Sequence, residues 1–126
     1  MPTTPTIDTP LALQEAFAAR FNARDLDGLL DLAEPDSAFV PEPGQLVTGE
    51  GYRAALVNYL SLDLPITLTP RHQLISGDLA LLVGDWTIDG TGPDGSAVHL
   101  AGSTADVARH GDRGWRFVID NPFGTA

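Results

Sequence analysis

The chain has 126 residues, a formal charge of −10 and no cysteine. Its length is typical of one domain, and a hydrophobic content of 43% is enough for one core. The missing cysteines exclude disulfides, thiolate catalysis and cysteine metal sites, and the acidic balance disfavours nucleic acids and anionic membranes as partners.

The first segment of the chain has no periodicity. Residues 1–8 are rich in Pro and Thr, and we expect a flexible tail there, ahead of a single domain over residues 9–126. The tail lacks the basic region and apolar run of a secretory signal. No stretch reaches the roughly 20 apolar residues that span a bilayer. We therefore expect a cytoplasmic protein without membrane contact.

Three helices are predicted in the first half of the chain. Thr9 is suited to be the N-cap of the first helix, with Pro10 at its first position, and apolar residues then recur at helical spacing. Asp25 caps the second helix, and Pro35 stops it. The predicted helices cover residues 10 to about 22, residues 26–33 and a stretch after residue 51.

The second half of the chain alternates between apolar and polar residues, which predicts strands separated by Gly- and Asp-rich turns. Helices followed by antiparallel hairpins are typical of an α+β fold. Gly84 and Gly102 lie inside strands, where glycine indicates a bend or a close approach. Two short strands are expected at residues 38–40 and 46–47. The long strands are expected at residues 66–75, 79–88, 98–109 and 115–121.

Alternation along each strand also divides the side chains between two faces. It places Trp86 on the face opposite Asp85, and Asn121 on the face opposite Asp120. We expect Asp85 and Asp120 to be solvent or interface charges. Asp106 alternates with apolar neighbours, and sequence alone leaves open which of its strand's faces lines a pocket.

Four short motifs occur in a recognisable order: NARDLDGLL at residues 22–30, AFVP at 38–41, Gly49 with Arg53, and GWRFVIDN at 114–121. Over about residues 10–124 they resemble the nuclear transport factor 2-like (SnoaL-like) superfamily. The resemblance implies a cone-shaped α+β fold, with three N-terminal helices packed on a curved antiparallel sheet of four to six strands. It also implies an apolar pocket and a homodimer through the sheet.

Members of this superfamily include isomerases, cyclases, epoxide hydrolases and dehydratases, so the fold predicts function poorly. Ketosteroid isomerases combine a carboxylate base with an oxyanion hole of Tyr and protonated Asp. The resemblance puts Asp106 at the oxyanion-hole Asp, Trp86 at an aromatic pocket position and Asn121 at a pocket position near the end. Phe17 stands where the Tyr is needed, and Pro41 falls near the base position. We therefore do not expect steroid isomerisation.

Asp106 is the first candidate acid or base, because burial on the pocket face would raise its pKa. On the outer face it would be an ordinary solvated carboxylate. His72 and His99 are weaker candidates, since such a histidine is more often a surface or interface residue. No metal-ligand spacing occurs, and we expect neither metal nor cofactor. The predicted ligand-binding residues are Phe17, Phe21, Phe39, Tyr52, Trp86, Phe117, Ile119 and Asn121.

Two hypotheses of function follow. In the first, the chain is a cofactor-independent enzyme that isomerises, cyclises or dehydrates a hydrophobic, oxygen-bearing molecule. In the second, it is a ligand-binding or association module without turnover. A small hydrophobic molecule is the expected partner in either case. Leu79, Leu81 and Val83 would also need cover from a second copy if they face outward.

Overall fold

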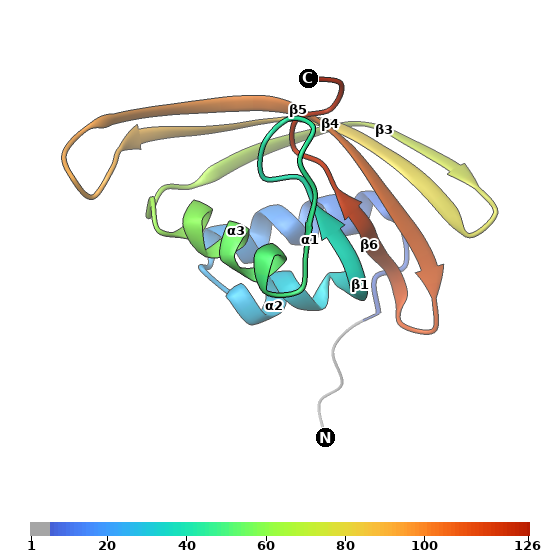
Figure 1. Cartoon of the computed structure of the whole chain (residues 1–126). Helices are drawn as coiled ribbons and strands as arrows, with labels where there is room; N and C mark the ends of the chain where they lie inside the picture. The colour runs from blue at the N-terminus through green and yellow to red at the C-terminus, as the bar shows by residue number, and fades with distance from the viewer. Residues whose placement is uncertain (1–5) are drawn as a thin grey trace.

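The computed structural model describes residues 6–126, which form three helices and one six-stranded sheet (Figure 1). This confirms the mixed α+β class. Residues 1–5 of the predicted tail lie outside the described residues. The helices are α1 (Pro10–Asn22), α2 (Leu26–Asp31) and α3 (Glu50–Leu60). The strands are β1 (Ala33–Phe39), β2 (Val47–Thr48), β3 (Ile66–Ser76), β4 (Leu79–Thr91), β5 (Ala97–Gly111) and β6 (Gly114–Asp120).

The first two helices begin at the predicted capping residues. The Thr9 hydroxyl accepts a hydrogen bond from the Ala12 N–H at 3.0 Å, and the Asp25 carboxylate accepts one from the Gly28 N–H at 2.9 Å. Each cap satisfies a backbone N–H that has no partner inside its helix. Helix α2 is shorter than the predicted range 26–33, because the Leu32 carbonyl already accepts a hydrogen bond from the Phe117 N–H in β6.

The strands lie side by side in the order β2-β1-β6-β5-β4-β3. Long strands β3, β4 and β5 arch over the three helices (Figure 1). Strand β1 contacts α2 and α3, and β6 contacts α1. The prediction of an antiparallel sheet is correct for every described pair except β1 and β6, which are parallel. The chain leaves β1, passes through α3 and the hairpins, and returns alongside β1 in the same direction.

Two strands each contain one extra residue. Pro70 pairs with Gly84 and His72 with Val83, so Arg71 has no partner of its own in β4. In β6, Phe117 pairs with Ala108 and Ile119 with Val107, so Val118 is extra. Such β-bulges bend a strand and change which side chains point to which face. The bulge at Val118 determines the geometry of the candidate site described below.

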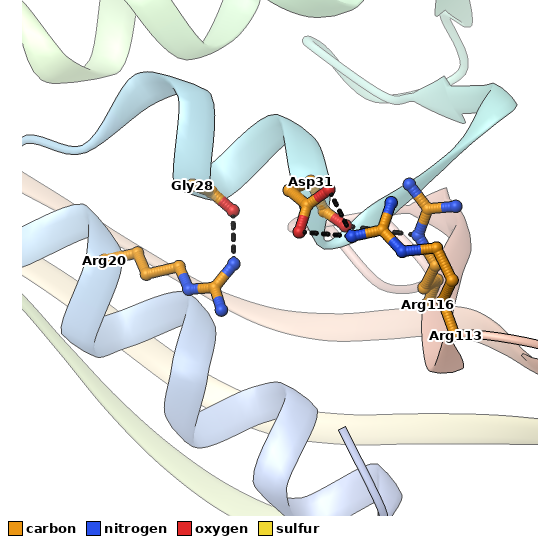
Figure 2. A network of polar contacts seen from close by, with 5 residues as sticks. All are labelled: Arg20, Gly28, Asp31, Arg113 and Arg116. Atoms are coloured by element: carbon orange, nitrogen blue, oxygen red, sulfur yellow. Dashed lines mark hydrogen bonds and ion pairs between the residues drawn. The ribbon is translucent and has the colours of Figure 1, made fainter. Parts of the chain in front are cut away.

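A polar network joins the short helix α2 to its neighbours (Figure 2). Arg20 of α1 donates to the Gly28 carbonyl at 2.7 Å. Arg113, in the turn between β5 and β6, forms two hydrogen bonds to the Asp31 carboxylate at 2.7 and 2.9 Å. Arg116 of β6 donates to the Asp31 carbonyl at 3.1 Å. These contacts hold α2 against α1, the turn between β5 and β6, and β6 itself.

Residues ahead of α1 also contact the sheet. The Ile7 carbonyl accepts a hydrogen bond from the Trp115 N–H at 2.9 Å, and Ile7 forms an isolated parallel bridge with Gly114. The structure therefore holds Ile7 against the start of β6. No helix within residues 6–126 combines the length and apolarity that a membrane crossing requires.

Candidate functional site

A cavity of about 40 Å³ lies between α1, α3 and the inner face of the sheet. Its walls are mainly aromatic and aliphatic, and four polar side chains interrupt them. No basic side chain among the described residues lines it. The lining residues are Gln14, Phe17, Phe21, Phe39, Leu56, Tyr59, Ile66, Leu68, Trp86, Ile88, Thr104, Asp106, Phe117, Asp120 and Pro122.

Two carboxyl groups meet in this cavity. Asp106 comes from β5 and Asp120 from the end of β6, and each side chain is 5% exposed. The two carboxyls are joined by a hydrogen bond. Asp106 Oδ1 also accepts the Asn121 N–H at 2.7 Å. Asp120 Oδ2 has no hydrogen-bond partner within the described residues, although it is fully buried.

Burial raises the pKa of both carboxyls, because a buried negative charge loses its hydration. The charge of Asp120 adds to this effect and keeps the pKa of Asp106 well above its usual range. The pKa of Asp120 is raised to about 7. Two carboxyls in contact titrate as a pair, so this pair retains a proton at neutral pH. The group is therefore able to accept or release a proton inside an apolar cavity.

The bulge at Val118 brings Asp120 into the site. Simple alternation from Phe117 would turn Ile119 inward and Asp120 outward. Because Val118 is an extra residue, Phe117 and Asp120 both line the cavity. The sequence-based expectation that Asp120 is a solvent or interface charge is therefore wrong. No glycine or proline marks the bulge, so the sequence contained no signal for it.

Trp86 forms part of the wall, but its indole N–H is already used. It donates to the Pro122 carbonyl at 2.7 Å, and this hydrogen bond passes over Gly102. A Cβ on Gly102 would lie 2.7 Å from that carbonyl oxygen and 2.8 Å from the indole nitrogen. Gly102 is thus the close-approach point that its position inside a strand indicated. The indole N–H of Trp86 therefore points to the Pro122 carbonyl and not to a ligand in the cavity.

Gln14 is a polar cavity residue that sequence reasoning missed. It lies on α1 and is 2% exposed. Its amide nitrogen donates to the Val83 carbonyl at 3.3 Å, and its oxygen accepts from Gln73 at 2.8 Å. These bonds satisfy the buried amide and connect α1 to β3 and β4. A glutamine between helical apolar positions could have been singled out, because such a site is usually apolar.

The structure brings only some of the predicted ligand-binding residues to the cavity. Phe17, Phe21, Phe39, Trp86 and Phe117 line it, whereas Tyr52, Ile119 and Asn121 do not. Tyr52 packs edge-on behind Phe39, with ring centroids 5.3 Å apart, and lines a separate surface cleft. Burial, and then the charges of Asp120 and Asp106, raise the pKa of the Tyr52 phenol. Ile119 is half-buried beyond the bulge.

Asn121 contributes to the site through its backbone. Its N–H binds Asp106, while its side chain stabilises the following turn through Phe123 and the Gly124 carbonyl. His72 and His99 are exposed and lie outside the cavity lining, and His99 pairs with Asp89 at the surface. Among residues 6–126, no three acidic or histidine side chains gather as a metal ion would require.

Several solved structures share this fold. One protein from Thiobacillus denitrificans, named for a calcium/calmodulin-dependent protein kinase type II association domain, has a TM-score of 0.75 at 22% identity. The alignment covers 94% of this chain and 96% of that one. An NTF-2-like protein of unknown function from Shewanella oneidensis has a TM-score of 0.72 at 18% identity, covering 87% and 92%.

A hexachlorocyclohexane dehydrochlorinase, LinA-type3 from Novosphingobium barchaimii, also resembles this chain. Its TM-score is 0.71 at 18% identity, and the alignment covers 86% of this chain and 79% of that one. No curated protein matches the sequence. At these identities the likeness establishes the fold alone. The family model of the SnoaL-like domain matches residues 14–117, most of the sequence, and the chain therefore belongs to the SnoaL-like domain family.

Proposed function

We propose that this chain is a cofactor-independent acid–base enzyme that acts on a small hydrophobic, oxygen-bearing molecule. One observation carries the proposal: two carboxyl groups share a hydrogen bond inside an apolar cavity, and Asp120 Oδ2 is buried there without a partner. An unpaired buried polar atom costs stability, and such costs are typical of functional sites. Isomerisation, cyclisation and dehydration are the reaction classes that need only such proton transfers.

Asp120 is the group that reaches the substrate. Asp106 is bonded to the Asn121 N–H on one side and to Asp120 on the other, which leaves Asp120 Oδ2 as the free acceptor. In an isomerisation, Asp120 takes a proton from one carbon and returns it to another, so no proton is gained or lost overall. Asp106 is the second carboxyl of the pair and keeps its proton. The hydrogen bond between Asp106 and Asp120 stabilises whichever of the two is ionised.

The proposal is tested by proton exchange on a panel of small ketones and hydroxyketones in D₂O. Wild-type protein should catalyse exchange of the hydrogens next to the carbonyl, followed by NMR. Asp120→Asn should slow exchange by about 10²-fold or more, since it removes the base but keeps the shape. Trp86→Ala should mainly weaken binding. Asp112→Asn, at an exposed turn position, is the matched control and should retain the wild-type rate.

Absence of exchange above the Asp120→Asn level for every compound would reject the enzymatic proposal. A ligand-binding or association module without turnover is the alternative. Its support is the outer face of the sheet, where Leu74, Leu79 and Leu81 are 57%, 43% and 39% exposed. Two similar structures are also named for an association domain. In this alternative a second copy of the chain covers that face and the cavity only holds a ligand.

A further inference from the structure

The cavity around the carboxyl pair is small. A volume of about 40 Å³ holds only about two or three waters, whereas pockets for larger ligands enclose about 300 Å³ or more. A hydrophobic substrate with several carbon atoms therefore needs more room than a cavity of this volume offers. Binding of such a substrate therefore requires the cavity to widen at one part of its wall.

A surface groove of about 280 Å³ lies directly behind one cavity residue. Tyr59 lines both the cavity and the groove, so its side chain forms part of the wall between them. Among residues 6–126, no other residue lines both spaces. The remaining groove residues are Pro41, Glu42, Gln45, Ala55, Asn58, Leu62 and Leu100.

The contacts of Tyr59 suit a side chain that turns. It lies in the last turn of α3 and is only partly buried. Its ring meets Trp86 edge-on and Phe39 at a tilt, each with centroids 6.2 Å apart. Such contacts between aromatic rings are worth little individually, and the phenol end of Tyr59 is polar enough to point toward water. Phe21 and Leu56, in contrast, are almost completely buried and are fixed by the core.

We propose that Tyr59 is a gate, and that its rotation joins the cavity to the groove so that one elongated ligand occupies both. The ligand's compact head lies beside Asp106 and Asp120, and its apolar body extends past Tyr59 toward Leu62 and Leu100. This inference rests on the proposed function in so far as the cavity is the binding site. It adds the residue that sets the length of the ligand.

The charges around the path limit the ligand further. The compact head of the ligand would lie beside two carboxyls, and Glu42 lines the groove. The chain as a whole has a formal charge of −10. No basic side chain of the described residues lines either space. An anionic ligand would be repelled along the whole path. The ligand class is therefore an elongated, apolar molecule without negative charge.

Two fluorescent probes with the same ring skeleton test this: neutral N-phenyl-1-naphthylamine and its anionic 8-sulfonate. Stopped-flow fluorescence gives their association rates with wild-type protein, Tyr59→Ala, Tyr59→Phe and, as a control on the exposed side of α3, Val57→Ala. Shifts of the Thr104 and Asp106 amide NMR signals show whether the probe enters the cavity. Tyr59→Leu replaces Tyr59→Ala if the latter does not fold.

We expect Tyr59→Ala to speed association of the neutral probe at least 10-fold and Val57→Ala to stay within twofold of wild type. Tyr59→Phe should associate no faster than wild type, because it keeps the ring and loses the phenol that can point to water. The sulfonate should bind at least 10-fold more weakly. If the amide signals shift but Tyr59→Ala associates at the wild-type rate, the gate is wrong while the cavity stays a binding site. If the signals shift in no variant, the gate and the proposed binding site both fail.

Discussion

Asp106 and Asp120 join their carboxyl groups by a hydrogen bond inside the SnoaL-like cavity, and an extra residue in β6 makes this contact possible. Without the bulge at Val118, Asp120 would point to the outer face of the sheet. The pair places two ionisable groups in the interior, one with an unpaired oxygen, and their burial lowers the stability of the fold. Its presence should therefore be visible in the stability of the protein as well as in its chemistry.

The first prediction concerns the pH dependence of stability. The folded-state pKa of Asp120, about 7, lies above the 3.8 of a free aspartate, so the folded protein holds a proton that the unfolded chain has released. That stabilisation is complete below about pH 4 and is lost as the pH rises through 7. The free energy of unfolding should fall over this range, by at most about 1.4 kcal/mol per pH unit for each such proton.

Asp120→Asn should flatten this fall and make the protein more stable than wild type at pH 8, because no charge then forms at residue 120. Urea unfolding between pH 5 and pH 8 measures both effects. Asp112→Asn, at an exposed position, should follow the wild-type curve. Equal slopes for wild type and Asp120→Asn would show that Asp120 titrates like a solvated carboxylate.

The second prediction concerns Gly102. A methyl group there would overlap the Pro122 carbonyl oxygen and the Trp86 indole nitrogen, which are joined across it. Gly102→Ala should therefore destabilise the fold by about 1–3 kcal/mol. Gly111→Ala is the control, since a Cβ placed there meets no atom within 4 Å from the rest of the described chain, its two sequence neighbours apart. Chemical unfolding measures the loss, and similar values for the two variants would contradict the crowding at Gly102.

The third prediction separates two arginines that hold α2. Arg113 pairs with Asp31 at the surface, where its side chain is 50% exposed. Exposed ion pairs contribute little, so Arg113→Ala should cost less than about 1 kcal/mol. Arg116 is partly buried and donates to the Asp31 carbonyl at the end of α2. Arg116→Ala leaves that carbonyl unpaired and should cost more, about 1–2 kcal/mol. Urea unfolding ranks the two, and the reverse order would refute this reasoning.

The sequence predicted the regular parts of this molecule well, because local rules determine them. Thr9 and Asp25 cap helices through their own side chains, and uninterrupted alternation in β4 and β5 places Trp86 and Asp106 on one face. The failures lie where distant segments meet. Asp120 is turned inward by a bulge that only its pairing with β5 reveals.

The same limit explains the other errors at the site. The Trp86 N–H is taken by the Pro122 carbonyl, which comes from the far end of the chain. Gln14 becomes a cavity residue only because Gln73 and Val83 lie opposite it. The parallel pairing of β1 with β6 likewise depends on how the whole chain returns. Apart from the glutamine between helical apolar positions at residue 14, none of these contacts has a local pattern that sequence reasoning could detect.

The last prediction concerns the outer face of the sheet, which we propose to be the contact between two copies. Leu74 pairs with Leu81, and Leu81 with Val107, so these side chains form one row across three strands. Farther along the same face, Asp85 forms an ion pair with Arg71 and accepts a hydrogen bond from the Ser103 hydroxyl. An apolar row with a polar margin is typical of a protein interface, and a row of exposed leucines is costly in a monomer.

Leu81→Arg should convert a wild-type dimer into a monomer, because two arginines would meet, unpaired, at the centre of the contact. Sedimentation velocity measures the mass of each form at the same protein concentration. Leu46→Arg is the matched control: Leu46 is 62% exposed but lies in the loop before β2, outside the row of Leu74, Leu81 and Val107. It should leave the dimer intact. A wild-type monomer, or a Leu81→Arg dimer, would mean that this face is not where the copies meet.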